Sequence, residues 1–149
     1  MPREASPFFS QTDRGMPWQT YDIPSDSNYR LPAEEKLLRC LADTGYDDHA
    51  VFSIRLAFDE AVANAIKHGN KMDFSKKVHI RFDVNDTRAV IEVEDEGQGF
   101  CDESLPDPCS HENLERPHGR GVMLIKSFMD EVEYEKCGRL VRMIKYRDS

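Results

Sequence analysis

The sequence predicts an α+β fold in which helices pack on one face of a mostly antiparallel sheet and form a two-layer sandwich. Two amphipathic helical patterns and four alternating strand patterns carry this prediction, because helices and antiparallel strands that are segregated along a chain pack as two layers. The chain has 149 residues, of which 39% are hydrophobic and 32% charged. This size and composition indicate one globular domain.

The longer helical patterns lie in the first half of the chain. The first runs from Pro32, a favourable residue in an opening turn, to about Gly45. The second starts at Asp47 or Asp48 as N-cap and ends before Gly69. A shorter helix is expected near residue 122, where apolar residues recur at helical spacing: Val122, Ile125, Phe128 and Met129.

The strand patterns lie in the second half. Apolar and polar residues alternate over 78–84 and again over 89–94, which predicts adjacent antiparallel strands across an Asn85-Asp86 turn. Two further strands are expected at about Val132–Cys137 and Leu140–Tyr146, joined at a glycine.

Prolines mark the two irregular segments. Residues 1–18 mix proline, serine, glutamine and charge without periodicity, so we expect a flexible N-terminal tail before a domain at 19–149. Residues 101–118 hold three of the eight prolines and are expected to form a long loop, which in a compact domain is often a lid over a site.

Composition excludes several function classes. The net charge of −8 disfavours an extended nucleic-acid surface. The sequence contains neither an apolar stretch of membrane-spanning length nor an apolar signal-peptide core, so we expect a cytoplasmic protein without a membrane segment. In that setting the cysteines are expected to be free thiols, with the first and last as small buried side chains. The four are Cys40, Cys101, Cys109 and Cys137.

A polar line runs along the second helix. Glu60, Asn64 and His68 repeat every four residues, opposite an apolar line that starts at Phe58. The small residues Ala57, Ala61 and Ala65 flank the polar line and would leave room for a ligand. The alternative is that the polar line is the solvated face of an amphipathic helix.

Two glycine clusters follow. Asp95 continues the inward parity of its strand, and Gly97 and Gly99 would let backbone pass close to a planar ligand; the alternative is an ordinary acidic turn. Gly119-Arg120-Gly121 opens a helix, where free N–H groups favour a phosphate, although Gly-x-Gly alone is weak evidence.

Taken in order, these motifs resemble those of the GHKL ATPase superfamily, whose Bergerat-type fold binds ATP beneath a lid. Glu60-Ala-Val-Ala-Asn64-Ala-Ile-Lys-His68-Gly69-Asn70 resembles its N box, and Asp95-Glu-Gly97-Gln-Gly99-Phe100 its first glycine box. The segment from Leu114 to Gly121 resembles the second glycine box. Within the superfamily the chain is most similar to the anti-sigma factor serine kinases of the RsbW type, over about residues 20–147.

The resemblance implies roles for these residues. Glu60 would be the general base towards a serine hydroxyl, Asn64 a ligand of Mg²⁺, and Asp95 the acceptor of the adenine amino group. Four glycines would line the nucleotide: Gly97, Gly99, Gly119 and Gly121. Arg116 is the nearest match to a lid arginine that contacts the terminal phosphates, with Arg120 as a competitor. His68 matches a frequent N-box histidine, and a capping role at the helix end explains it equally well.

The resemblance also implies partners. RsbW-type kinases form homodimers, sequester a sigma factor and phosphorylate a STAS-domain antagonist. Two alternatives remain open: a non-catalytic, ATP-binding anti-sigma module, and a stand-alone catalytic domain that transfers phosphate to a histidine. A zinc site is not expected, because the candidate ligands lack the paired Cys-x-x-Cys spacing. Those candidates are Cys101, Cys109, His111 and His118.

Overall fold

The computed structural model describes residues 18–97 and 119–147, with only the backbone for 119–123. Within this part of the chain, five strands form one antiparallel sheet in the order β1-β2-β3-β5-β4. The strands are β1 (Gln19–Pro24), β2 (Lys77–Val84), β3 (Arg88–Glu94), β4 (Glu131–Glu135) and β5 (Leu140–Tyr146). The helices are α1 (Leu31–Thr44), α2 (Asp48–Asn64) and α4 (Gly119–Phe128), with short helical turns η3 (Ser27–Arg30), η4 (Ala65–Gly69) and η5 (Lys136–Gly138).

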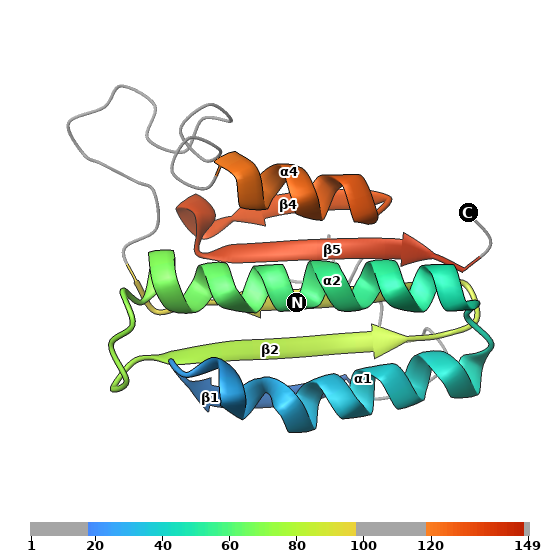
Figure 1. Cartoon of the computed structure of the whole chain (residues 1–149), viewed down its shortest axis with the longest axis horizontal. Coiled ribbons are helices and arrows are strands. Elements are labelled where there is room, and N and C mark those ends of the chain that lie inside the picture. Colours follow the sequence, from blue (N-terminus) through green and yellow to red (C-terminus); the bar gives the residue numbers. More distant parts are fainter. Residues whose placement is uncertain (1–17, 98–118, 148–149) are drawn as a thin grey trace, which may run out of the picture.

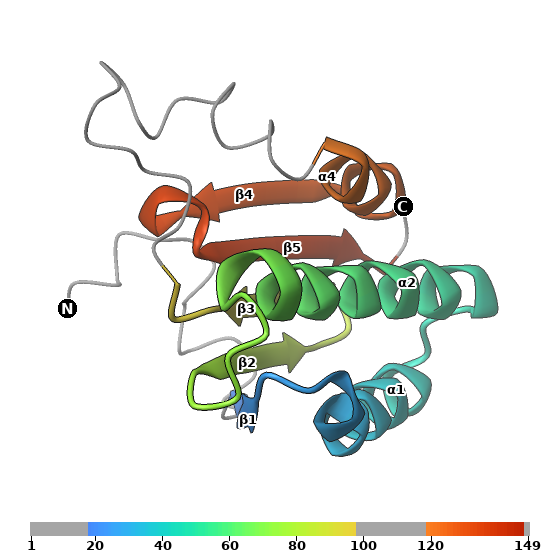
Figure 2. The same cartoon turned by 60° about the vertical axis from the view of Figure 1, so that its left-hand side comes forward.

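The three α-helices lie on the same face of the sheet, with α2 between α1 and α4 (Figures 1 and 2). The predicted two-layer α+β sandwich is therefore confirmed. The expected N-terminal tail and the expected lid at 101–118 lie outside the described residues, apart from Trp18.

The helices begin and end close to the expected positions. Pro32 lies in the first turn of α1, which ends just before Gly45. The Asp47 side chain accepts a hydrogen bond from the N–H of Ala50 at 2.8 Å and caps α2. Beyond Asn64 the helix continues as the π-helical turn η4, a form that often occurs at functional sites.

The β2–β3 hairpin turns where the sequence indicates. Val84 pairs with Ala89, and the side-chain oxygen of Asn85 accepts from the N–H groups of Thr87 (2.8 Å) and Arg88 (3.0 Å). The β4–β5 hairpin differs slightly from the prediction, because β4 ends at Glu135 and residues 136–138 form the η5 turn.

The edge strand β1 is absent from the sequence-based assignment. It pairs with β2 from Gln19 opposite Phe82 to Pro24 opposite Lys77. Burial alternates over residues 19–23, but Ile23 is the only buried residue and aspartate and proline are poor strand formers, so the pattern is too weak to mark a strand in the sequence. Hydrogen bonding to β2 therefore holds β1 in a strand conformation that its own residues favour only weakly.

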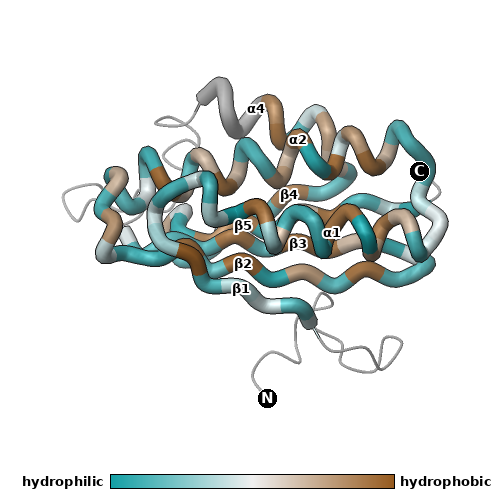
Figure 3. The backbone as a smooth tube through the Cα atoms, turned by 60° about the horizontal axis from the view of Figure 1, so that its bottom comes forward, coloured by the Kyte–Doolittle hydropathy of each residue, from teal (hydrophilic) through white to brown (hydrophobic). Residues whose placement is uncertain are grey.

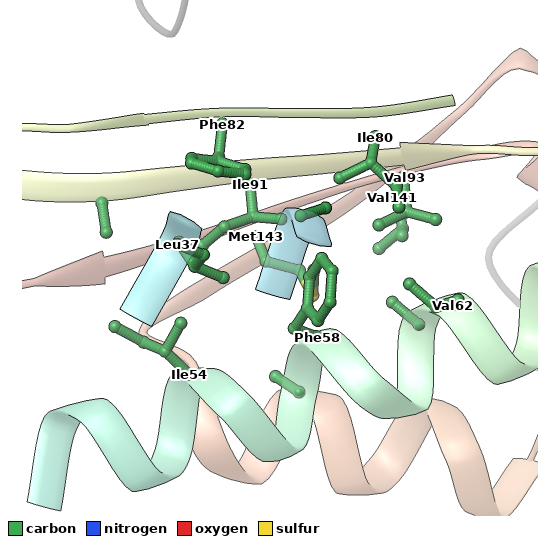
Figure 4. Close-up of a cluster of buried hydrophobic side chains, with 14 of the residues drawn as sticks. Leu37, Ile54, Phe58, Val62, Ile80, Phe82, Ile91, Val93, Val141 and Met143 are labelled. Atoms are coloured by element: carbon green, nitrogen blue, oxygen red, sulfur yellow. The ribbon is translucent and has the colours of Figure 1, made fainter. Parts of the chain in front are cut away.

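The core lies between α2 and the sheet. Phe58 and Val62 of α2 point towards side chains of β3 and β5, among them Ile91 and Met143, and Leu37 of α1 joins them (Figure 4). All five side chains are buried, which confirms the predicted apolar line of α2. Hydrophobic and hydrophilic segments alternate along α2 and the strands accordingly (Figure 3).

A charged row crosses the opposite face of the sheet. Glu92, expected on the polar side of β3, is buried between Arg81 and Arg142, and Arg142 Nε donates to it at 2.8 Å. Arg142 also pairs with Glu135 at 2.6 Å. The buried charges are thus paired, as burial requires.

The cysteines correct one expectation. Cys40 is a free thiol, partly buried against the core. Cys137 is disulfide-bonded, so the expectation of a free, buried thiol is wrong for this residue. The physical reason is its position: it lies partly exposed in the η5 turn at the tip of a hairpin rather than in the core.

None of the helices in the described part of the chain is long and apolar enough to cross a bilayer.

Candidate functional site

A pocket lies where the end of α2 faces the ends of β3 and β5. Its helical wall consists of Ala61 and Asn64 of α2 and Ala65 of η4, and its sheet wall includes Val93 and Asp95. The small side chains of Ala61 and Ala65 are buried on this side of the helix. The result is an apolar recess with an amide and a carboxyl group at its border.

Asp95 is the buried acid of this pocket. It is 7% exposed, and its Oδ1 accepts a hydrogen bond from the N–H of Gly97 at 2.8 Å. Burial raises the pKa of Asp95 to about 6, while the Gly97 N–H and the charge of Arg139 act in the opposite direction. Near neutral pH the carboxylate is therefore largely ionised and able to accept a hydrogen bond from a ligand.

Two glycines allow this arrangement. A Cβ at position 69 would overlap the Asp95 carboxyl group, and a Cβ at position 97 would overlap the carbonyl of Gly69. Sequence reasoning explained Gly69 as a helix stop; its close approach to Asp95 is a second, independent reason for glycine. The backbone at Gly69, the last residue of η4, therefore lies directly against the backbone at Gly97 in the turn after β3.

Asn70 connects the segments at the same junction. The sequence places it at the end of the N-box motif but gives no sign of this positioning role. Asn70 is fully buried, and its Oδ1 accepts from the N–H of Glu96 at 2.8 Å. Its Nδ2 donates to Ser25 Oγ (2.9 Å) and to the Lys77 carbonyl (3.0 Å). One side chain thus connects the β1–η3 turn, the start of β2 and the turn after Asp95.

The structure brings together some of the sequence-predicted residues. Asn64 and Asp95 border one pocket, although 31 positions separate them in the sequence. Glu60 is partly exposed one helical turn before Asn64 and does not line this pocket. His68 is exposed at the end of η4.

The remaining predicted residues are only partly described. Gly119, Arg120 and Gly121 form the first turn of α4, which confirms that this motif opens a helix. Gly99 and Arg116 lie outside the described residues, as do the lid cysteines and histidines. Within the described residues no group of three potential metal-ligating side chains occurs.

Arg139 is a residue that sequence reasoning missed. It lines the pocket, and its carbonyl accepts from the N–H of Asp95 at 2.9 Å. The sequence carries no signal for it, because it enters the site through the pairing of β3 with β5.

The polar groups at this pocket can accept a hydrogen bond from a ligand. The buried Asp95 carboxylate borders an apolar recess, and the two close glycines keep side chains away from the junction beside it. The opening turn of α4 offers N–H groups of the kind that bind phosphate.

The sequence is similar to those of known ATPase-domain proteins. Residues 23–145 match the histidine kinase-like ATPase domain. The serine-protein kinase RsbW of Staphylococcus epidermidis is 34% identical over 113 residues, which cover 70% of each chain. The anti-sigma F factor of Caldanaerobacter subterraneus subsp. tengcongensis is 39% identical over 103 residues, 64% of this chain and 70% of that protein.

A solved structure shows the same fold. The RsbU and RsbW domains of a Mycobacterium tuberculosis protein align with a TM-score of 0.59 at 17% identity. The alignment covers 89% of this chain and 32% of that one, so the chain spans about a third of its structural relative.

Fold, pocket and sequence matches together define an α+β domain of the ATPase class. The chain belongs to the histidine kinase-like ATPase family, in which RsbW serine-protein kinases and anti-sigma F factors are its relatives.

Proposed function

We propose that this chain is an ATP-dependent serine protein kinase and anti-sigma factor, which phosphorylates a STAS-domain antagonist and sequesters a sigma factor. The observation that carries the proposal is the shared pocket of Asn64 and Asp95, with Glu60 one turn away on the same helix. The names of its relatives, serine-protein kinase RsbW and anti-sigma F factor, support the same activity.

Each group has a defined task in this proposal. The Asp95 carboxylate would accept a hydrogen bond from the adenine amino group, and the amide oxygen of Asn64 would hold Mg²⁺, which would neutralise charge on the phosphates. Gly97, Gly99, Gly119 and Gly121 line the nucleotide, and either Arg116 or Arg120 contacts the phosphates. His68 is proposed to contact the nucleotide from the end of η4.

The transfer step needs one proton acceptor. The Glu60 carboxylate takes the proton of the acceptor serine while the serine oxygen bonds to the γ-phosphorus and the bond to the ADP oxygen breaks. Since phosphoryl transfer depends mainly on positioning and charge neutralisation, no further catalytic group is required.

Transfer from γ-labelled Mg-ATP to the STAS-domain proteins of the source organism tests the proposal. We expect an acid-stable phosphoserine in wild type and none in Glu60→Ala, with Mg-ATP affinity unchanged. An acid-labile product would identify histidine transfer instead. ATP binding without any transfer would identify a non-catalytic anti-sigma module.

The proposed partners need separate measurements. We propose a homodimer, for which sedimentation equilibrium should give twice the 17.2 kDa of one chain. Binding of a purified sigma factor in the presence of Mg-ATP, lost on addition of unphosphorylated antagonist, is the expected result for the regulatory switch.

A further inference from the structure

A second hollow lies on the other side of α2 from the nucleotide pocket. This groove, of about 490 Å³, has a helical wall that includes Ala63, Ile66 and Lys67 and a loop wall of Met72 and Phe74. The β1–η3 turn closes it at residues 25–27. The described function of the nucleotide pocket makes no use of it.

The loop wall presents large apolar side chains to solvent. Met72 is 64% exposed and Phe74 58% exposed, and the ring of Tyr29 meets that of Phe74 edge-on with centroids 6.1 Å apart. Three neighbouring exposed apolar side chains form a patch of the kind that marks interaction surfaces.

The loop holds this patch in a fixed conformation. Lys71 and Met72 adopt left-handed backbone angles, with φ of 55° and 61°, which cost free energy in residues other than glycine. The N–H of Met72 donates to the Ile66 carbonyl at 2.7 Å, and Lys76 N–H donates to the Asp73 carbonyl at 2.9 Å. The strained loop is thus anchored to α2 with its apolar side chains facing outward.

The helix end and loop beside the groove carry more lysines than acids. Residues 67–77 contain four lysines and one aspartate, in a chain of net charge −8. The groove itself is lined by one acid, Asp26, which accepts a hydrogen bond from the N–H of Asn28 as the cap of η3, and by one base, Lys67. Lys67 and Lys71 are exposed beside the apolar side chains.

The groove also leads towards the proposed catalytic base. Glu60, Ala63 and Lys67 are spaced i, i+3 and i+7 and therefore share one face of α2. The junction residue Asn70 bonds Ser25, which lines the groove, and Glu96, which follows Asp95. The groove and the nucleotide pocket thus share both a helix and a buried side chain.

We propose that this groove docks an acidic segment, bearing an apolar side chain, of the protein that accepts the phosphoryl group. This inference rests on the proposed kinase function. The apolar side chain packs against Met72 and Phe74, the acidic residues face the lysines, and the chain continues along α2 to bring a serine to Glu60.

Paired variants test the docking site. Met72→Ser with Phe74→Ser removes the apolar wall, and Lys67→Glu with Lys71→Glu reverses the charge. Phe52→Ser is the matched apolar control, since Phe52 is 55% exposed on α2 about 21 Å from Ile66 at 1.5 Å per residue. Arg39→Glu is the charge control on the exposed side of α1.

Three quantities are measured for each variant: Mg-ATP affinity, KM for phosphorylation of the STAS-domain proteins of the source organism, and the Kd of those proteins with Mg-ADP bound. We expect both groove variants to raise KM and Kd at least tenfold, with Mg-ATP affinity within twofold of wild type. The two controls should stay within twofold in all three measurements.

The outcomes separate the two proposals. If wild type phosphorylates a STAS-domain protein and the groove variants match it within twofold, the docking site is wrong and the kinase function stands. If wild type binds such a protein without phosphorylating it and the groove variants lose binding, the docking site stands and the kinase function is wrong. If wild type neither binds nor phosphorylates any of them, both are overturned.

Discussion

Replacing Asp95 by asparagine should stabilise the nucleotide-free protein while weakening ATP binding. Burial raises the pKa of Asp95 from 3.8 to about 6, so the folded protein is penalised when the carboxylate ionises. Two pKa units correspond to about 3 kcal/mol, which solvent at the open side of the pocket reduces to about 1–2 kcal/mol. The asparagine oxygen can still accept from the N–H of Gly97.

The sign of the pH dependence follows from this shift. The stability contributed by protonated Asp95 is fully present below pH 3.8 and is lost as pH rises through about 6. Asp95→Asn should therefore have a higher free energy of unfolding than wild type at pH 7.5 and the same free energy of unfolding at pH 4. Urea unfolding of the nucleotide-free proteins at both pH values measures this difference.

Nucleotide binding should change in the opposite direction. Loss of a charged acceptor costs about 1.5–3 kcal/mol, or a 10- to 150-fold higher Kd for Mg-ATP at pH 7.5. Wild-type affinity should also fall as pH drops below about 6, whereas that of the variant should not. A variant that is less stable than wild type at pH 7.5, or that binds Mg-ATP equally well, would refute the reasoning.

Three further predictions concern the junction and the α1–α2 interface. Gly69→Ala should lower the free energy of unfolding by about 1–3 kcal/mol, because the added Cβ overlaps the Asp95 carboxyl group. The loss should be much smaller in an Asp95→Gly background, and a double-mutant cycle by urea unfolding measures this coupling. Asn70→Ala should cost about 2–4 kcal/mol in the same assay because it leaves buried polar groups unpaired, and a loss below 1 kcal/mol would contradict its anchoring role. Glu34 of α1 is buried, and burial together with the hydrogen bond to Asp59 of α2 raises its pKa from 4.5 to about 7. The stability contributed by protonated Glu34 is fully present below pH 4.5 and is lost as pH rises through about 7, so wild type should lose more stability between pH 4.5 and 7.5 than Glu34→Gln, as urea unfolding at the two pH values would show.

The sequence predicts most of this fold because local signals agree with the tertiary structure. The N-cap at Asp47, the apolar line through Phe58 and the turn at Asn85 each act within one element or one hairpin. Strand β1 escapes prediction because its stability comes from pairing with β2, 53 or more positions away, rather than from its own residues.

The residues of the candidate site also fall into two groups, those that the sequence indicates and those that it does not. Asp95 stands out because it puts a carboxyl group at an inward position of its strand, and Asn64 because it continues a polar repeat beside a line of alanines. Asn70 and Arg139 do not stand out, since their importance lies in contacts with distant segments: Asn70 with Ser25 and Glu96, and Arg139 with the backbone of Asp95. Residues that position a site through long-range hydrogen bonds leave no periodic signal.

Helix α2 with its π-helical extension η4 lies between the two proposed binding sites and borders both. Its large side chains, among them Phe58 and Val62, occupy the face that packs on the sheet. Alanines occupy the two remaining directions: Ala61 faces the nucleotide pocket, and Ala63 faces the groove. Because a larger side chain at either position would fill the adjoining hollow, the alanines keep both open along a helix that the core holds rigid. A protein segment in the groove and a nucleotide in the pocket would then meet at Glu60 and Asn64, where the helix surface passes from one hollow to the other.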